Sequence, residues 1–485
     1  MSSSTQTPRA SSQRDLTSGS LTRTLLRLAW PMAVGSAFQA LYNMVDSFWL
    51  GRLDKNALGA PGVCLPLVFM VIAFGMGFGS AGTALVSQHT GAGRPRDAGR
   101  AAAQTILLLT VLCAAFSAPI SIFATDLLRL ARVPDDVLVH ASGYLRIYAL
   151  SLPFTIFAIA YGSVLRAVGD TLTMVYVGLA TNVLNAVLDP LLIFGAGPVP
   201  AMGAEGAALA TLLSVLLGAL ICARLLSKQH AGLNLSRTDF RPARAILGQI
   251  WRVGLPAGLS NSSNALGFAT MQVIINMLGA TVIAAFSVGS RISNLFDIPG
   301  FAVAAATTPI VGQALGAGKP QLADRAVRRS VTLIALGMLP PYALLVWQGS
   351  AVARIFTDSP EVIREAQWFF FVVPASRYCF TVMSALAAAF QGSGHNKPWL
   401  ILSVVRQWLL RLPVCYLLGI VLTWGSTGVY IGFVIGNILS ALMALWLFHV
   451  VDWRQPIVKA REAVKEDGAD ATTKAALPQP TGTPE

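Results

Sequence analysis

The chain has 485 residues, of which 54% are hydrophobic and 12% charged, and its formal net charge is +13. Soluble domains carry about 25% charged residues, so this composition excludes a soluble protein of about three domains. It also excludes a disordered chain, because the apolar content is too high. The charges cluster between long apolar runs, which predicts an all-α polytopic membrane protein. The five cysteines are scattered singly, and no nucleotide-binding, hydrolase or metal motif is present. We therefore expect no enzyme activity, no cofactor, no metal site and no nucleic-acid partner.

Five segments follow one another along the chain. We predict a disordered cytoplasmic tail over 1–24, an N-lobe over 25–226, a cytoplasmic linker over 227–246, a C-lobe over 247–450 and a second disordered cytoplasmic tail over 451–485. The lobes contain twelve apolar runs, each longer than the ~20 residues that cross a bilayer as a helix. These runs cover 25–50, 57–85, 101–124, 141–166, 172–194, 203–226, 247–275, 281–313, 327–349, 363–390, 398–421 and 427–450.

The distribution of basic residues predicts the orientation of these helices. With the N-terminus in the cytoplasm, 24 of the 35 Lys and Arg residues fall in cytoplasmic segments and 7 on the outer side. Positive charge accumulates on the cytoplasmic side of membrane proteins. We therefore expect both termini in the cytoplasm. The membrane is expected to be the inner or plasma membrane of the cell.

An internal repeat appears at a constant offset of 225 residues. Gly91-Ala92-Gly93-Arg94-Pro95 matches Gly316-Ala317-Gly318-Lys319-Pro320, and the further matching pairs are Pro31 and Pro256, Gly75 and Gly300, Gln88 and Gln313, and Gly169 and Gly394. Six helices per unit give both units the same orientation, so the fold is predicted as twelve transmembrane helices in two parallel six-helix repeats.

Three acids lie well inside the spans, where a carboxylate is costly and therefore a candidate functional group. Asp46 and Asp189 lie at similar depth in the outer half of the N-lobe, and Asn185 is one helical turn from Asp189 on the same face. Oxygen ligands of this kind suit H⁺ or Na⁺, and burial raises the pKa of a carboxyl group. The alternative is that each acid only hydrogen-bonds neighbouring helices. The repeat partners of the two acids are Met271 and Val414, so ion coupling is expected in the first repeat alone.

The C-lobe has the opposite charge. The four basic residues and the one acid inside its spans are candidates for lining a substrate cavity: Arg291, Asp297, Arg377, Arg406 and Arg411. Two interpretations stay open. The arginines brace helices, which we favour narrowly, or they form a basic patch for anionic parts of a substrate. An ion pair between Arg291 and Asp297 is a further interpretation, although six positions on one helix place them on different faces.

Pro31 lies inside the first span, on the same helix as Asp46. A proline inside a helix kinks it and frees a carbonyl. Pro31 therefore either causes a static bend or acts as a hinge. As a hinge, it would link protonation of Asp46 to a change in the shape of the cavity.

The chain resembles the multidrug and toxic compound extrusion (MATE) family over almost all of 25–450, and within it the DinF-like branch. The resemblance rests on the Gly-Ala-Gly-Arg-Pro and Gly-Ala-Gly-Lys-Pro loops, on Leu41-Tyr42-Asn43-Met44-Val45-Asp46, and on Asn185 through Asp189-Pro190. It implies a V-shaped pair of lobes around a central cavity and an ion-coupling site at Asp46, Asn185 and Asp189. The same resemblance implies that Thr211 joins this site and that the helix bends at Pro31.

These features predict a secondary active exporter that expels drugs or other organic compounds in exchange for H⁺ or Na⁺. We expect a monomer whose partners are the lipid bilayer and a small-molecule substrate. One alternative is a flippase for lipid-linked or polysaccharide substrates of the same superfamily. Another is a membrane receptor without transport, although the short tails leave no sensory domain.

Overall fold

The structure is a computed structural model that describes residues 16–50, 52, 55–195, 197–198, 200–232 and 235–458, apart from the side chains of 43–48, 50, 55–59 and 231. Within these residues the long elements are all helices. The first lobe contains α1 (Leu21–Leu50), α2 (Lys55–Gly91), α3 (Pro95–Ile122), α4 (Ala124–Leu130), α5 (Asp135–Ala167), α6 (Leu172–Phe194) and α7 (Gly203–Ser227). The second contains α8 (Arg244–Asn276), α9 (Ala280–Gly316), α10 (Pro320–Arg354), α11 (Pro360–Ser393), α12 (Asn396–Val404), η3 (Val405–Arg411), α13 (Leu412–Tyr416), η4 (Leu417–Val421) and α14 (Gly425–Val450).

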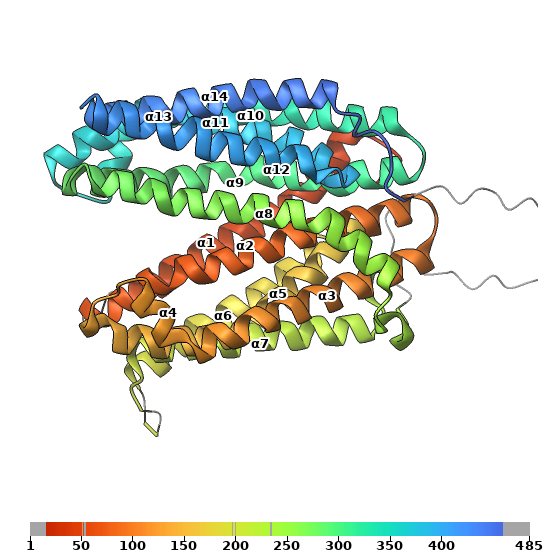
Figure 1. Cartoon of the computed structure of the whole chain (residues 1–485), viewed down its shortest axis with the longest axis horizontal. Helices are drawn as coiled ribbons and strands as arrows, with labels where there is room; N and C mark the ends of the chain where they lie inside the picture. The colour runs from red at the N-terminus through yellow and green to blue at the C-terminus, as the bar shows by residue number, and fades with distance from the viewer. Residues whose placement is uncertain are drawn as a thin grey trace, which may run out of the picture.

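Two bundles lie side by side, converge near the start of α1 and diverge toward the opposite end (Figure 1). Ten helices of the described chain are long and apolar enough to cross a membrane, with 396–421 counted as one. The segment Ser260–Asn264 of α8 is polar, and three of its side chains bond residues of the eleventh span, namely Ser403, Arg406 and Trp408. The two remaining predicted spans are also helical, as α1 and α8. The all-helical architecture and the two-lobed shape therefore confirm the predicted fold class.

The repeat is visible in how corresponding helices begin and end. Gly93 and Gly318 both have positive φ, of 68° and 69°, and each precedes a proline at the start of the next helix. Glycine adopts positive φ without strain, and proline suits the first turn of a helix. Gly169 and Gly394, also 225 positions apart, end α5 and α11 with φ of 86° and 80°. The same local chemistry therefore builds the same turns in both lobes.

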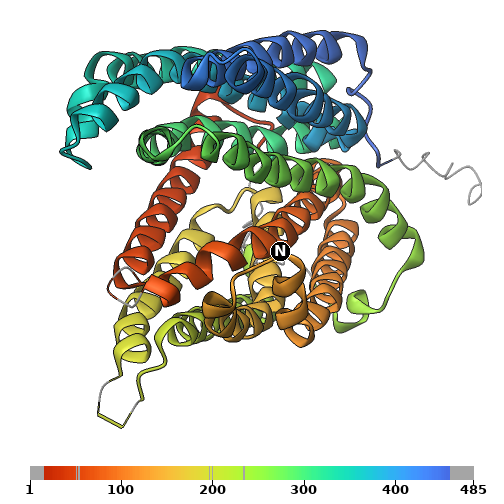
Figure 2. The same cartoon turned by 60° about the vertical axis from the view of Figure 1, so that its left-hand side comes forward.

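Each lobe has its own apolar core. The first joins α2, α3, α5 and α7 and extends to Ile250 and Val253 of α8, and the second joins α9, α10, α11 and α14. A smaller cluster lies between the lobes, where Leu25, Leu28 and Ala29 of α1 pack against α9. Figure 2 shows α1, in red, leaving the second lobe and descending along the first. This helix therefore belongs to both lobes.

The chain is ordered further toward both ends than the sequence indicated. Leu16 is buried and its backbone N–H donates to Oε1 of Gln313 at 3.0 Å. At the other end Trp453 is fully buried and its indole donates to the carbonyl of Phe448. The expected tails over 1–24 and 451–485 are therefore packed against the helices at Leu16 and at Trp453. The expected linker over 227–246 holds two short 3₁₀ turns, η1 (His230–Gly232) and η2 (Arg237–Phe240).

Candidate functional site

The first-lobe site is centred on a buried carboxylate of α6. Asp189 is fully buried and Asn185 almost so. Residues four apart share a helix face, and the Asn185 amide, oriented to satisfy its neighbours, donates from Nδ2 to Oδ2 of Asp189 at 2.8 Å. Its Oδ1 then accepts from the backbone N–H of Thr211 on α7, at 3.2 Å. The structure therefore brings these three residues together.

A tyrosine of α1 extends this cluster. The Tyr42 hydroxyl lies 3.4 Å from Oγ1 of Thr211, which also donates to the carbonyl of Ala207. Asp46 lies one helical turn beyond Tyr42 along α1, but its side chain lies outside the described residues. Tyr42 belongs to the motif Leu41-Tyr42-Asn43-Met44-Val45-Asp46, from which no role for its hydroxyl was predicted. Its position at i−4 from Asp46 was the available signal.

Pro31 lies where α1 passes from one lobe to the other. Before it, Leu28 and Ala29 pack against α9 of the second lobe. After it, a Cβ on Gly35 would lie 3.6 Å from Val175 of α6, in ordinary contact with the first lobe. The helix is continuous through Pro31.

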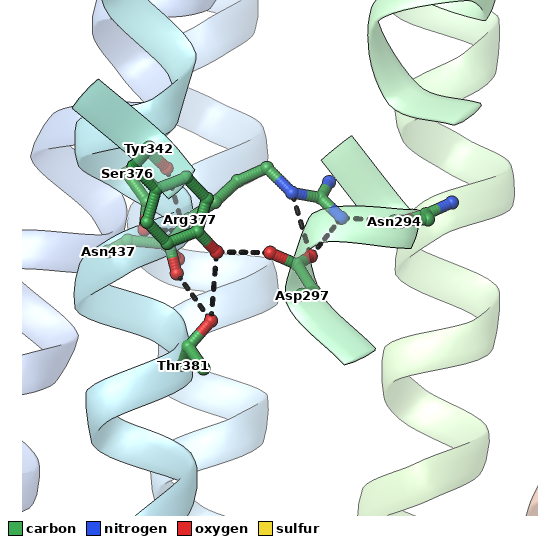
Figure 3. Close-up of polar contacts among 7 residues, drawn as sticks. All are labelled: Asn294, Asp297, Tyr342, Ser376, Arg377, Thr381 and Asn437. Carbon is green, nitrogen blue, oxygen red and sulfur yellow. Dashed lines mark hydrogen bonds and ion pairs between the residues drawn. The ribbon is translucent and has the colours of Figure 1, made fainter. Parts of the chain in front are cut away.

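The acid of the second lobe has a different partner from the one the sequence suggested. Arg377 of α11 pairs with Asp297 of α9, with Nε 2.9 Å from Oδ2, and also donates to Asn294 (Figure 3). Tyr342 of α10 donates to the other oxygen of Asp297 and lies 3.2 Å from the Thr381 hydroxyl. Asp297 is buried, so its charge is compensated by Arg377 and its oxygens by hydrogen bonds.

The possible pair between Arg291 and Asp297 does not form. Arg291 is exposed, and none of the ion pairs among the described residues includes it. Six positions along α9 turn the two side chains to different faces, as the helical period requires. The partner comes instead from a helix 80 positions away, which no local pattern in the sequence shows.

Arg406 and Arg411 are both buried, at 1% and 6% exposure. Arg406 donates to Oδ1 of Asn264 at 2.6 Å and to Oδ1 of Asn437 at 3.5 Å. Its guanidinium lies over the ring of Phe380, 4.6 Å from the centroid. Arg406 therefore joins α8, α11 and α14, as a bracing residue would.

Arg411 lies between two aromatic rings. Its guanidinium carbon is 4.0 Å from the centroid of Phe433 and 5.2 Å from that of Phe268. Of the five candidates in the second lobe, the structure thus joins Asp297 with Arg377 in one network. It places Arg406 and Arg411 together in a second group and leaves Arg291 outside both.

A family model for MatE proteins matches residues 31–191 and again 256–417. The two matches begin 225 positions apart, at Pro31 and Pro256, and together cover more than half of the chain. The chain belongs to the MATE family. It is therefore a multi-pass membrane transporter for small molecules and not an enzyme.

Several relatives of this MATE protein are similar along nearly their whole length. The FAD transporter of Shewanella oneidensis is 27% identical over 432 residues, which cover 89% of this chain and 95% of the relative. A probable multidrug resistance protein NorM of Thermotoga maritima is 27% identical over 446 residues, covering 92% and 96%. A solved multidrug resistance MATE transporter in an outward-facing conformation superimposes with a TM-score of 0.84 at 27% identity, covering 92% of this chain and 98% of that one.

Proposed function

We propose that this MATE transporter is a secondary active exporter that expels small organic compounds in exchange for H⁺ or Na⁺. The main support is a buried polar cluster on α6 and α7, formed by Asp189, Asn185 and Thr211. Tyr42 of α1 contacts this cluster through Thr211. A carboxylate buried inside a membrane-spanning segment is costly, and such groups commonly mark the sites of protons or cations. Carboxylate, amide and hydroxyl oxygens are hard ligands that suit either ion.

The mechanism follows from the helices that hold the group. Ion binding neutralises Asp189, and Asp46 on α1 completes the site. Because α1 packs on α9 before Pro31 and on the first lobe after it, a change at Tyr42 and Asp46 is transmitted to both lobes. Bending at Pro31 then changes the space between the lobes and lowers the affinity for substrate. The excess of Lys and Arg in alternate loops supports a cytoplasmic location for both chain ends, and we expect the substrate to leave on the opposite side.

The relatives support export of organic molecules without defining one substrate. One is named for FAD and another as a probable multidrug resistance protein. We expect the protein to work as a monomer, since each chain carries both lobes.

The test is efflux from proteoliposomes under a pH gradient or a Na⁺ gradient imposed separately. We expect one gradient to drive substrate accumulation and Asp189→Asn to reduce it at least about tenfold, a loss of roughly 1.4 kcal/mol or more. Asp126→Asn is the matched control, because Asp126 is an exposed acid of the same lobe. Transport by Asp189→Asn at the wild-type rate, or no response to either gradient, contradicts the proposal.

A further inference from the structure

Arg406 and Arg411 carry two positive charges inside the second lobe without a neighbouring acid. Among the described side chains, no carboxylate oxygen lies within 4.0 Å of either guanidinium. Removing a charge from water is costly unless a partner compensates it. The nearby Arg377 has such a partner in Asp297, whereas Arg406 and Arg411 have none among the described side chains.

A local change of helix geometry brings the two arginines together. Residues 405–411 form a π-helix, which joins residues i and i+5. In a regular α-helix, residues five apart point about 140° away from each other. Arg406 and Arg411 are five apart, so the π-helix turns them toward the same side. Such segments occur often at functional sites.

The two arginines differ in how their donors are satisfied. Both terminal nitrogens of Arg406 are hydrogen-bonded to asparagine side chains. The Arg411 side chain makes no hydrogen bond to any described residue. The Nε atoms of both arginines are buried without an acceptor, so the two differ at their terminal nitrogens. Its contacts are the two rings of Phe268 and Phe433, and Phe268 is 49% exposed. Arg411 therefore has free donors beside an aromatic ring that remains accessible.

Gln407 is a second unsatisfied group at the same place. It is fully buried, and neither its Oε1 nor its Nε2 has a hydrogen-bond partner among the described residues. It lies against Gly267, the residue before Phe268, where an added Cβ would lie 2.1 Å from its Cγ. Buried amides are almost always hydrogen-bonded, so this amide indicates a missing partner.

The internal repeat relates Gln407 and Arg411 to the first-lobe site, and the two sites carry opposite charges. The helix of Asp189 and Asn185 corresponds to the helix of Gln407 and Arg411, and Thr211 corresponds to Gly436. Asn185 bonds the backbone of Thr211, and Gly436 lies against Arg411, with its added Cβ 3.0 Å from the Arg411 Cα. One helix pair thus carries an acid in the first lobe and an arginine in the second.

We propose that Arg411 and Gln407, with the rings of Phe268 and Phe433, bind the anionic group of an aromatic organic substrate. This rests on the proposed function, since it names the substrate class of that exporter. The guanidinium supplies charge-assisted hydrogen bonds to a carboxylate or phosphate, and the rings contact the aromatic part. Arg406 holds the helix and does not itself bind the anion.

The test compares two dyes that share a xanthene ring and differ in charge, fluorescein and rhodamine 6G. Binding to the purified full-length protein is measured by fluorescence polarisation without any ion gradient. We expect fluorescein to bind more tightly than rhodamine 6G, and Arg411→Gln to weaken fluorescein binding at least about tenfold. Rhodamine 6G binding should change less than twofold. Arg354→Gln is the control, because Arg354 is an exposed arginine of the same lobe.

Thermal unfolding separates binding from bracing. Arg411→Gln should melt at or above the wild-type temperature, because it removes a buried charge that lacks a carboxylate. Arg411→Lys is the second variant, to be used if Arg411→Gln does not fold. It keeps the charge but loses the planar pair of donors, so we expect it to weaken fluorescein binding severalfold. Unchanged fluorescein affinity in either variant, or tighter binding of rhodamine 6G by the wild type, overturns the proposal. Failure of gradient-driven efflux would leave this equilibrium result intact, so the two proposals fail separately.

Discussion

Gln88 of α2 and Gln313 of α9, which are 225 positions apart, form the same hydrogen bonds with opposite lobes. Nε2 of Gln88 donates to the carbonyls of Gly392 and Ser393 at the end of α11, and Nε2 of Gln313 donates to the carbonyl of Ala167 at the end of α5. Helix ends leave carbonyls without partners in their own helix. Each lobe therefore supplies the cap that a helix of the other lobe lacks.

The oxygens of the same two amides hold the chain ends. Oε1 of Gln88 accepts from the backbone N–H groups of Ile457 and Val458, at 2.9 and 3.2 Å, and Oε1 of Gln313 accepts from that of Leu16. Replacing Gln88 with Ala leaves buried backbone groups unpaired, which costs about 1–3 kcal/mol. We expect Gln88→Ala to lower the melting temperature and to speed tryptic cleavage after Arg454. Gln272→Ala is the control, because Gln272 bonds only an exposed asparagine of its own helix. Equal melting temperatures and cleavage rates would contradict this role.

The glycines beside these glutamines allow the two helices to meet. A Cβ on Gly316 would lie 2.0 Å from the backbone oxygen of Gln88, and one on Gly91 would lie 2.0 Å from that of Gln313. Since backbone cannot move aside as a side chain can, Gly316→Ala should lower the unfolding free energy by about 1–3 kcal/mol. Gly337→Ala, with open space around its Cβ, should be neutral or stabilising by up to about 1 kcal/mol. Denaturation of both variants in detergent checks this, and a stable Gly316→Ala would disprove the close contact.

Pro31→Ala should slow transport without loss of stability. Alanine restores a helical hydrogen bond and removes the steric cause of bending where α1 changes lobes. Turnover in proteoliposomes and melting temperature are measured together. Pro119→Ala in α3 is the control, since that helix lies within one lobe. A wild-type turnover for Pro31→Ala would show that Pro31 is only a static bend.

The pair of Asp297 and Arg377 predicts a strong coupling in a double-mutant cycle. Removing one partner of a buried pair leaves an uncompensated charge and costs about 3–5 kcal/mol. Arg377→Gln and Asp297→Asn should each destabilise the protein, and the double variant should lose much less than the sum. Additive losses would mean that the two residues act independently.

The burial of His395, between α11 and α12, predicts that the stability of the protein depends on pH. Burial lowers the pKa of His395 below 6.5, and Arg252 lowers it further, while Asp452 and Ser393 oppose the shift. The folded state therefore disfavours the protonated ring. Stability is fully present above about pH 6.5 and falls as the pH drops below it, because the unfolded chain binds the proton more readily. The melting temperature between pH 7.5 and 5 should fall less for His395→Asn than for the wild type. Identical pH profiles would exclude His395 as the cause.

Apolar run length and the offset of 225 residues were enough to predict the helices and their duplication. The contact of Asn185 with Asp189 was also accessible, because residues four apart share a helix face. The amide of Gln88 was visible as one half of a repeated pair, but its role was not, since its partners lie about 300 positions away.

Other features required the three-dimensional structure. The partner of Asp297 lies on another helix, and helical periodicity describes only neighbours on the same one. The π-helix at 405–411 has the same apolar character as an α-helix, so composition does not reveal it. The packed segment after 450 carried a signal that was missed, because Trp453, Ile457 and Val458 are apolar residues in an otherwise polar tail.

The backbones of α2 and α9 contact each other directly at Gly91 and Gly316, and this contact has a mechanical consequence. With no side chain between the backbones, the contact is a fulcrum placed at one end of two long levers. A helix of 37 residues such as α9 is about 55 Å long. Rocking of one lobe by about 10° around this fulcrum would displace the far end of that lever by roughly 10 Å, while the Gln88 and Gln313 bonds near the fulcrum would stretch far less. The crossing at Gly91 and Gly316 thus converts small changes of angle into an opening wide enough for an organic molecule.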